Sequence, residues 1–212
     1  MLRFIRQAKK WLHGLLWGPK RYRHLFLAIN ENKTRRIMEI GTWNGRRALQ
    51  MIKTAQKFHP AKPVEYYGFD LFEQMTPEIF LEELSKQPPK LVEVKKMLDN
   101  SGAQVKLFQG FTKDTLPRLL PELPKMDFIF IDGGHAIETI QNDWDCASQL
   151  MHGQAIVIFD DYYEDRDDIG CKPVVEKIDS EVYRVEILKP QDQFTKSWGM
   201  LKINFVKVTK KS

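Results

Sequence analysis

The stretch Arg36-Ile-Met-Glu-Ile-Gly-Thr-Trp-Asn-Gly45 decides the fold that this sequence predicts. Its first half is apolar enough for a buried strand, which breaks at Gly41 into a tight turn, and Gly45 opens a helix. A strand, a glycine turn and a helix are how an α/β sheet presents a pocket for a nucleotide-like cofactor at the carboxyl ends of its strands. We therefore expect a cofactor site at this turn.

The same turn differs from the G-x-G-x-x-G fingerprint of dinucleotide-binding folds. In that fingerprint the middle glycine lets the backbone approach a pyrophosphate closely. Trp43, the bulkiest residue type, stands at that position here. The turn therefore disfavours a pyrophosphate and favours a cofactor with an adenosine but no phosphates, and S-adenosylmethionine (SAM) fits that description.

The chain continues as an alternation of strands and helices. Two of the predicted strands, 127–131 and 155–159, are continuous apolar runs, which are typical of strands buried on both faces of a parallel sheet. The predicted strands are 37–40, 64–69, 105–108, 127–131 and 155–159, and the predicted helices are 45–58, 76–86, 91–100, 113–120 and 136–151.

Two further β-rich stretches, 183–188 and 198–208, come after a short helix and are expected to pair antiparallel at the edge of the sheet. The sequence predicts a doubly wound α/β domain with a mostly parallel, seven-stranded sheet and an antiparallel edge strand, preceded by an N-terminal amphipathic helix. At 212 residues the chain suits one well-packed domain with an appendage.

The net charge of +5 is concentrated at the amino terminus. Residues 1–36 carry ten basic side chains and one acid, a charge of +9, which leaves −4 for the remainder. This asymmetry weakens the case for nucleic-acid binding by the whole domain. Cys146 and Cys171 stand apart, so that a disulfide framework or a zinc site is not expected.

Residues 1–17 have apolar side chains at helical spacing and a basic opposite face. Such a helix packs on the main domain, on a second subunit in a homodimer, or on an anionic membrane surface as a peripheral contact, and the sequence does not separate these alternatives. No apolar run approaches the roughly 20 residues needed to span a bilayer. We expect a cytoplasmic protein with a basic arm at 1–35 and the α/β domain at 36–212.

The residues that follow the predicted strands are candidates for a cofactor site. Asp70 ends the second strand, where a carboxylate accepts hydrogen bonds from the ribose hydroxyls of an adenosine; a turn cap is the alternative. Gly110, Phe111 and Thr112 end the third strand, where they suit an adenine slot, although any strand-to-helix turn favours glycine.

Three carboxylates follow the two apolar strands. Asp132 ends one strand, and Asp160 and Asp161 end the other, so that their oxygens suit Mg²⁺ at a shared sheet edge. The alternative is a helix cap and a polar turn. His135 follows Asp132 near the start of a helix, whose positive end is expected to keep the imidazole neutral and able to accept a proton. An exposed capping histidine is the other interpretation.

Five sequence blocks resemble, in order and spacing, the class I SAM-dependent methyltransferases, whose fold is Rossmann-like. More narrowly they are similar to the metal-dependent O-methyltransferases of the catechol and macrocin types. The blocks are Glu39-Ile-Gly-Thr-Trp-Asn-Gly45, Tyr67-Gly-Phe-Asp70, Val105-Lys-Leu-Phe-Gln-Gly110, Phe130-Ile-Asp-Gly-Gly-His135 and Ile156-Val-Ile-Phe-Asp-Asp161.

The resemblance implies roles for individual positions. Glu39, Gly41 and Trp43 match the segment around the methionine moiety, and Asp70 matches the ribose-binding acid. Catechol-type enzymes have asparagine at the position of Asp161 and lysine at that of His135, whereas the macrocin-like branch also has histidine. The implied cofactor-binding set is Glu39, Gly41, Thr42, Trp43, Gly45, Asp70, Leu71, Gly110, Phe111, Thr112 and Asp132, and the implied metal ligands are Asp132, Asp160 and Asp161.

The resemblance implies a SAM-dependent O-methyltransferase that acts on a hydroxyl of a small molecule or sugar, assisted by Mg²⁺ and with His135 as the general base. An RNA-directed methyltransferase is one alternative, suggested by the basic arm. A non-catalytic SAM-binding protein tethered to a membrane is another, although such a protein has no use for the acidic cluster and the histidine.

Overall fold

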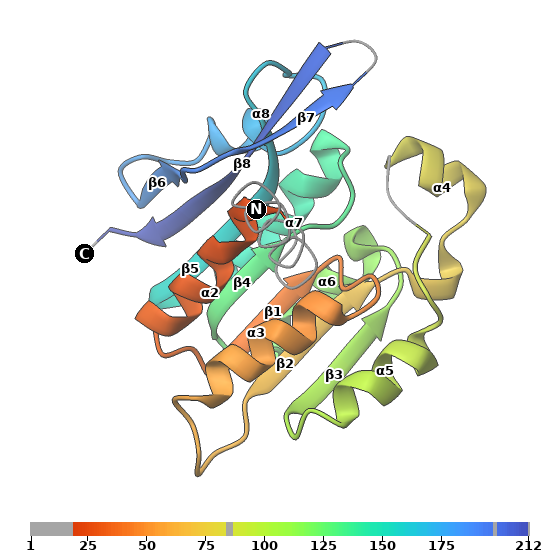
Figure 1. The fold of residues 1–212 in the computed structure, drawn as a ribbon, viewed down its shortest axis with the longest axis vertical. Helices are drawn as coiled ribbons and strands as arrows, with labels where there is room; N and C mark the ends of the chain where they lie inside the picture. The colour runs from red at the N-terminus through yellow and green to blue at the C-terminus, as the bar shows by residue number, and fades with distance from the viewer. Residues whose placement is uncertain (1–18, 84–86, 197–198, 212) are drawn as a thin grey trace, which may run out of the picture.

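The computed structural model describes residues 19–83, 87–196 and 199–211 (Figure 1). The amphipathic helix predicted for residues 1–17 lies outside this part of the chain. Among the described residues, no helix is both long and apolar enough to cross a membrane.

An eight-stranded sheet forms the centre of the fold (Figure 1). Its strand order is β3-β2-β1-β4-β5-β8-β6, with β7 paired to β8 outside this path. The strands are β1 (Arg36–Ile40), β2 (Glu65–Asp70), β3 (Gln104–Gln109), β4 (Met126–Ile131), β5 (Met151–Tyr163), β6 (Tyr183–Ile187), β7 (Asp192–Lys196) and β8 (Gly199–Lys210).

The strands β1 to β5 are mutually parallel, and β8 pairs antiparallel with β5, β6 and β7. The predicted doubly wound, mostly parallel α/β sheet is therefore confirmed. The sheet has one strand more than the seven expected, because β7 forms a hairpin with β8 in a stretch that was not predicted to be a strand. The strand expected at 155–159 is the middle of the longer β5.

Helices cover both faces of the sheet because successive apolar residues of a strand point to opposite faces. In β4, Phe128 and Phe130 pack on one face, whereas Ile129 and Ile131 pack on the other. The helices are α2 (Arg23–Glu31), α3 (Arg46–Gln56), α4 (Pro77–Glu82), α5 (Leu91–Asp99), α6 (Thr112–Leu119), α7 (Ile137–Leu150) and α8 (Lys172–Val175), with short 3-10 turns η1 (Lys20–Tyr22), η2 (Phe72–Gln74) and η3 (Leu120–Glu122).

The helix α2 precedes the expected domain boundary at residue 36 and packs on the α/β core. Its buried residues Leu25, Phe26, Ala28 and Ile29 belong to the same apolar core as Ile37 of β1. The helix lies beside α3 on one face of the sheet (Figure 1). The segment from Lys20 onward is therefore part of the α/β domain.

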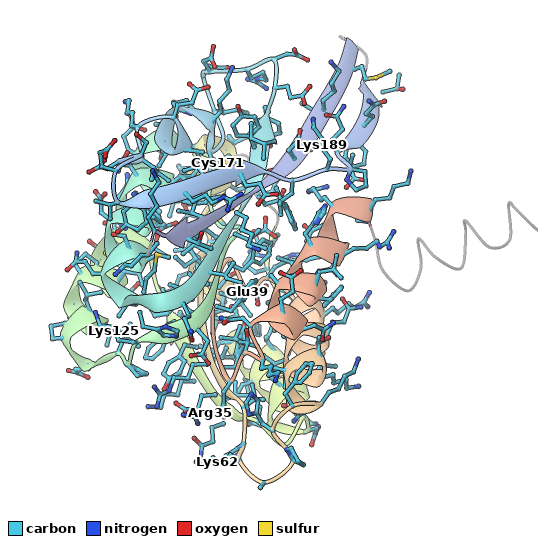
Figure 2. The ribbon with its side chains drawn as sticks, turned by 90° about the vertical axis from the view of Figure 1, so that its left-hand side faces the viewer. Arg35, Glu39, Lys62, Lys125, Cys171 and Lys189 are labelled. Carbon is cyan, nitrogen blue, oxygen red and sulfur yellow. The ribbon has the colours of Figure 1, made fainter. Side chains whose placement is uncertain are left out.

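The chain order of the strands reverses between β1 and β4. From β1 the chain proceeds to β2 and β3 on one side, and β4 leads to β5 on the other. Ligands of open α/β sheets bind beyond the carboxyl ends of the strands at such a point. Arg35, just before β1, and Lys62, before β2, lie near the bottom of Figure 2, whereas Glu39 lies inside the molecule, toward the carboxyl end of β1. The fold thus places a crevice beyond Ile40 and Ile131.

Candidate functional site

One cavity of about 470 Å³ opens at the reversal point. Every residue predicted for the site lines it except Gly45. Gly45 instead has φ +69° immediately before α3, and a Cβ there would lie within 2.8 Å of Val94 and Met97. Its role is therefore to start α3 and to let α5 pack closely.

Gly41 makes the close approach between β1 and β4 possible. It has φ +92°, and a Cβ at this position would lie 1.9 Å from the carbonyl oxygen of Asp132. The amide of Asp132 in turn donates to the carbonyl of Ile40 at 2.9 Å. Only glycine fits here, because both the backbone conformation and the space exclude a side chain.

The turn after Gly41 is tied to β2. The backbone N–H of Trp43 donates to Oδ2 of Asp70 at 2.6 Å, and that of Phe72 donates to Oδ1 at 2.8 Å. Burial raises the pKa of Asp70, which these backbone hydrogen bonds oppose. The indole Nε1 of Trp43 donates to the carbonyl of Gln87 at 3.2 Å. Asp70 thus holds the turn and also faces the cavity, where the predicted ribose contact remains a prediction.

Glu39 is a buried carboxyl beneath the turn. Its side chain is 1% exposed and accepts a hydrogen bond from the hydroxyl of Tyr66, which also contacts Oγ1 of Thr42 at 3.2 Å. Burial raises the pKa of Glu39 to about 8, although the Tyr66 hydrogen bond opposes this shift.

The three predicted carboxylates lie together. Asp132, Asp160 and Asp161 each offer an oxygen, and these atoms lie within 4.8 Å of one another. Burial and the charges of Asp160 and Asp161 raise the pKa of Asp132 well above its ordinary value. Clustered carboxylates of this kind require a compensating cation or proton.

Arg21 supplies a cation to this cluster, and the sequence did not predict it. Its Nε and Nη2 atoms donate to Oδ1 and Oδ2 of Asp160 at 2.7 and 2.9 Å. The hydroxyl of Tyr22 donates to Oδ2 of Asp160 at 3.0 Å and lies 3.4 Å from Oδ2 of Asp132. The ten basic residues of positions 1–36, together with the net negative charge of the remainder, were the signal that could have suggested such a pair.

His135 is held on both ring nitrogens. Its Nδ1 lies 2.6 Å from the carbonyl oxygen of Glu83, and its Nε2 lies 2.8 Å from Oδ2 of Asp161. Burial favours the neutral ring, but the hydrogen bond and the charge of Asp161 outweigh it and raise the pKa of His135 to about 9. This direction is opposite to the expected neutral imidazole, because the partner carboxylate favours the charged ring.

Glu83 is a second residue that the sequence did not predict. It follows α4 and is 2% exposed. Its carboxylate accepts hydrogen bonds from Oγ1 of Thr139 at 2.6 Å and from the backbone N–H of Ala136 at 3.0 Å. A Cβ at Gly134 would lie 2.1 Å from this carboxylate. Glu83 thus anchors the segment after β2 to the loop that carries His135, and no short motif marks that contact.

Comparisons with known proteins agree with this geometry. A family model described as a methyltransferase domain matches residues 38–162, which is more than half of the chain. None of the curated proteins matches the sequence.

Several solved structures share the fold at low sequence identity. The O-methyltransferase TomG of Streptomyces achromogenes, solved in complex with SAM, is 18% identical, with 88% of this chain and 78% of that chain covered and a TM-score of 0.60. The O-methyltransferase of Bacillus cereus, solved in complex with S-adenosylhomocysteine (SAH), is 16% identical. The match covers 89% of this chain and 80% of that chain, with a TM-score of 0.59.

A structure described as a putative rRNA methylase of Clostridium thermocellum is equally similar. It is 12% identical, with 90% of this chain and 97% of that chain covered and a TM-score of 0.63. At these identities the likeness establishes the fold and leaves the methyl acceptor open. The chain therefore belongs to the methyltransferase-domain family and is a SAM-dependent methyltransferase with the class I fold.

Proposed function

We propose that this enzyme transfers the methyl group of SAM to a hydroxyl oxygen of a small molecule or sugar. The observation that carries the proposal is a single cavity that joins two sets of residues. One set is the turn after β1 with Asp70, and the other is His135 with Asp161. A methyl donor bound at the turn would thereby lie in the same cavity as a group that can take a proton.

The cofactor half of the cavity suits an adenosine without phosphates. Asp70 offers carboxylate oxygens for ribose hydroxyls, and Gly110, Phe111 and Thr112 border the neighbouring part of the cavity. Trp43 covers the turn where a pyrophosphate would need close contact with the backbone. These features support SAM with its methionine end beside Gly41.

The chemical step is an in-line displacement. The acceptor oxygen forms a bond to the methyl carbon as the carbon–sulfur bond breaks, and the sulfonium leaves as the neutral thioether of SAH. The hydroxyl proton has to leave the oxygen in the same step or before it. Most of the rate gain comes from holding the oxygen and the methyl group in line.

His135 is the proposed acceptor of that proton. The carbonyl of Glu83 receives Nδ1–H, which leaves the lone pair of the neutral ring on Nε2. After proton transfer the imidazolium forms the ion pair with Asp161 that the structure contains. The arrangement therefore corresponds to the protonated state, and catalysis requires the neutral ring.

The magnesium ion implied by the resemblance does not fit the carboxylates as they are arranged. Both oxygens of Asp160 accept hydrogen bonds from Arg21. The two oxygens of Asp161 are engaged by Tyr163, at 2.9 Å, and by His135. Each oxygen of Asp160 also accepts a second hydrogen bond, from the backbone N–H of Asp161 or from the hydroxyl of Tyr22, so that neither has a lone pair left for a divalent ion. The proposed reaction therefore contains no metal-dependent step.

The proposal is tested with the full chain, SAM and a panel of hydroxylated sugars and catechols. Formation of SAH together with a product carrying one added methyl group on oxygen supports it. A product methylated on the nitrogen of a base, with RNA as the acceptor, would instead support the RNA-directed alternative. SAM binding without turnover on any acceptor class, RNA included, would favour the non-catalytic alternative.

A further inference from the structure

The guanidinium of Arg21 sits on the carboxylate cluster as a forked ion pair. Nε and Nη2 reach the two oxygens of Asp160 at 2.7 and 2.9 Å. Two parallel hydrogen bonds between a planar guanidinium and a carboxylate are the strongest form of this pair. Both oxygens of Asp160 therefore have a cationic partner.

Asp192 holds Arg21 from the opposite side. Its Oδ2 accepts from Nη1 of Arg21 at 3.1 Å and from the backbone N–H of Arg21 at 3.1 Å, while Oδ1 accepts from the backbone N–H of Lys20 at 2.9 Å. Asp192 begins β7, the strand that adds a hairpin to the sheet. The arginine is thus fixed between the end of β5 and the start of β7.

The pair is shielded from water. Arg21 is 6% exposed and Asp160 is 3% exposed. The guanidinium carbon lies 4.9 Å from the ring centroid of Tyr22 and 5.4 Å from that of Phe205. A desolvated charge pair is costly to break, because loss of one partner leaves the other charge buried and uncompensated. We therefore regard the buried, ion-paired Arg21 as a structural component of the site.

We propose that Arg21 takes the place of a divalent cation in this cluster, so that the methyl transfer proposed above proceeds without a metal ion. The catalytic part of this inference rests on that proposed function. The occupation of the carboxylate cluster by Arg21 does not depend on which reaction the enzyme performs. Arg21 acts as a positioning residue. Its forked hydrogen bonds hold the Asp160 carboxylate in place, and Asp160 in turn accepts a hydrogen bond from the Tyr22 hydroxyl at the edge of the cavity.

Arginine and a metal ion exclude one another at this position. A magnesium ion lies about 2.1 Å from its oxygen ligands. Oδ1 of Asp160 accepts from Nε of Arg21 and from the backbone N–H of Asp161, both at 2.7 Å, and Oδ2 accepts from Nη2 of Arg21 at 2.9 Å and from the hydroxyl of Tyr22 at 3.0 Å. Each carboxylate oxygen has two lone pairs, so neither oxygen of Asp160 has one left for a metal ion while Arg21 is bound. Removal of the guanidinium would leave three neighbouring carboxylates, which is a donor set that favours a hard divalent cation.

The first test measures binding of Mn²⁺ alone to the full chain by electron paramagnetic resonance and calorimetry. The wild type should show no stoichiometric Mn²⁺ binding. Arg21→Met, which keeps length without charge, should gain it, and a second change, Asp160→Asn, should abolish the gain. The exposed neighbour Arg23 provides a matched control, since Arg23→Met should behave as the wild type. Arg21→Lys, which keeps a cation, should still exclude manganese.

The second test uses turnover. Wild-type activity should survive exhaustive chelation and should not respond to added Mg²⁺ or Mn²⁺. In Arg21→Met, kcat should fall at least about tenfold, which corresponds to roughly 1.4 kcal/mol, with an unchanged KM for SAM and partial recovery in Mn²⁺. Loss of wild-type activity on chelation would overturn the proposal.

The two tests separate failure of this inference from failure of the proposed function. If the wild type binds Mn²⁺ stoichiometrically and Asp160→Asn does not, the proposed role of Arg21 is overturned, whatever the methyl acceptor is. Suppose that no O-methylated product forms, while the wild type excludes manganese and Arg21→Met binds it. The role of Arg21 as the cation of the cluster is then supported, and only the proposed methyl-transfer reaction is refuted. If Arg21→Met does not fold, as judged by circular dichroism, the wild-type binding measurement decides alone.

Discussion

Nε2 of His135 lies 2.8 Å from Oδ2 of Asp161, and this pair connects the loop after β4 with the end of β5. The contact fixes the imidazole beside the other carboxylates and favours its protonated form. A histidine that serves as a base in this place has to lose a proton that its partner carboxylate stabilises. The activity of the enzyme should therefore depend on pH through this pair.

Asp161→Asn should shift the pH profile of kcat/KM to lower pH. In the wild type, activity should rise with pH through the pKa of His135, which is about 9, because only the neutral ring accepts a proton. The variant loses the charge that raises this pKa, while burial, which lowers it, remains. Initial rates across the pH range, with the exposed Asp99→Asn as control, measure the shift. An unmoved rising limb would show that His135 does not set it.

His135→Ala should lose turnover and retain its affinity for SAM. The hydrogen-bond partners of the imidazole are Glu83 and Asp161, and neither belongs to the turn after β1. General-base catalysis contributes about 10² to 10⁴ in rate, and we expect a loss in this range. Calorimetry with SAM and single-turnover rates separate binding from chemistry. Normal methylation by the variant would refute the assignment of the base.

Gly41→Ala should destabilise the fold by more than about 1 kcal/mol and weaken SAM binding. The added Cβ would lie 1.9 Å from the carbonyl oxygen of Asp132, at a φ of +92°. Gly153→Ala is the matched control, because a Cβ there meets nothing within 4 Å. Urea unfolding of both variants measures the difference. Equal stabilities would mean that β1 and β4 need no close approach at this point.

Glu39→Gln should flatten part of the pH dependence of stability. The folded-state pKa of Glu39 is about 8, against an ordinary value of 4.5. The folded protein therefore binds this proton more tightly than the unfolded chain, so that stability falls as pH rises from about 4.5 through 8. Glutamine does not titrate, and the free energy of unfolding of the variant minus that of the wild type should increase over this window. Urea unfolding at several pH values measures it, with the exposed Glu93→Gln for comparison. A difference that stays constant with pH would contradict the shift.

Asp70→Asn should weaken SAM binding by about tenfold, or roughly 1.4 kcal/mol. The wild-type carboxylate already accepts the N–H groups of Trp43 and Phe72, and ribose hydroxyls would add to these. An SAH analogue without ribose hydroxyls provides the control for the site of the loss. Removal of the ribose hydroxyls from SAH should cost less affinity in Asp70→Asn than in the wild type. Equal losses in the two proteins would place the ribose elsewhere.

The part of the cavity lining that comes from the turn after β1 could be predicted from the sequence, because it is local. The apolar strand, Gly41 and the turn lie in one stretch, and a parallel sheet brings the carboxyl ends of its strands to one edge. The same argument correctly placed Asp132 beside Asp160 and Asp161. These predictions needed only the periodicity of the strands and the residues that follow them.

The contacts that set the charge state of the site could not be predicted in this way. Arg21 reaches Asp160 across 139 positions of sequence, from a segment that was expected to be a separate arm. The partner of Nδ1 in His135 is a backbone carbonyl, that of Glu83, which carries no sequence signal. The raised pKa of His135 follows from packing between distant segments rather than from its place before a helix.

The central claim is transfer of the SAM methyl group to oxygen. The most direct measurement incubates the full chain with SAM labelled with ¹³C in its methyl group and the hydroxylated acceptor panel, and then reads the label by NMR. We predict that the label appears as a methyl group bound to an acceptor oxygen, with one SAH released for each methyl group transferred. A label bound to nitrogen or carbon, or SAH release without a methylated acceptor, would contradict the account.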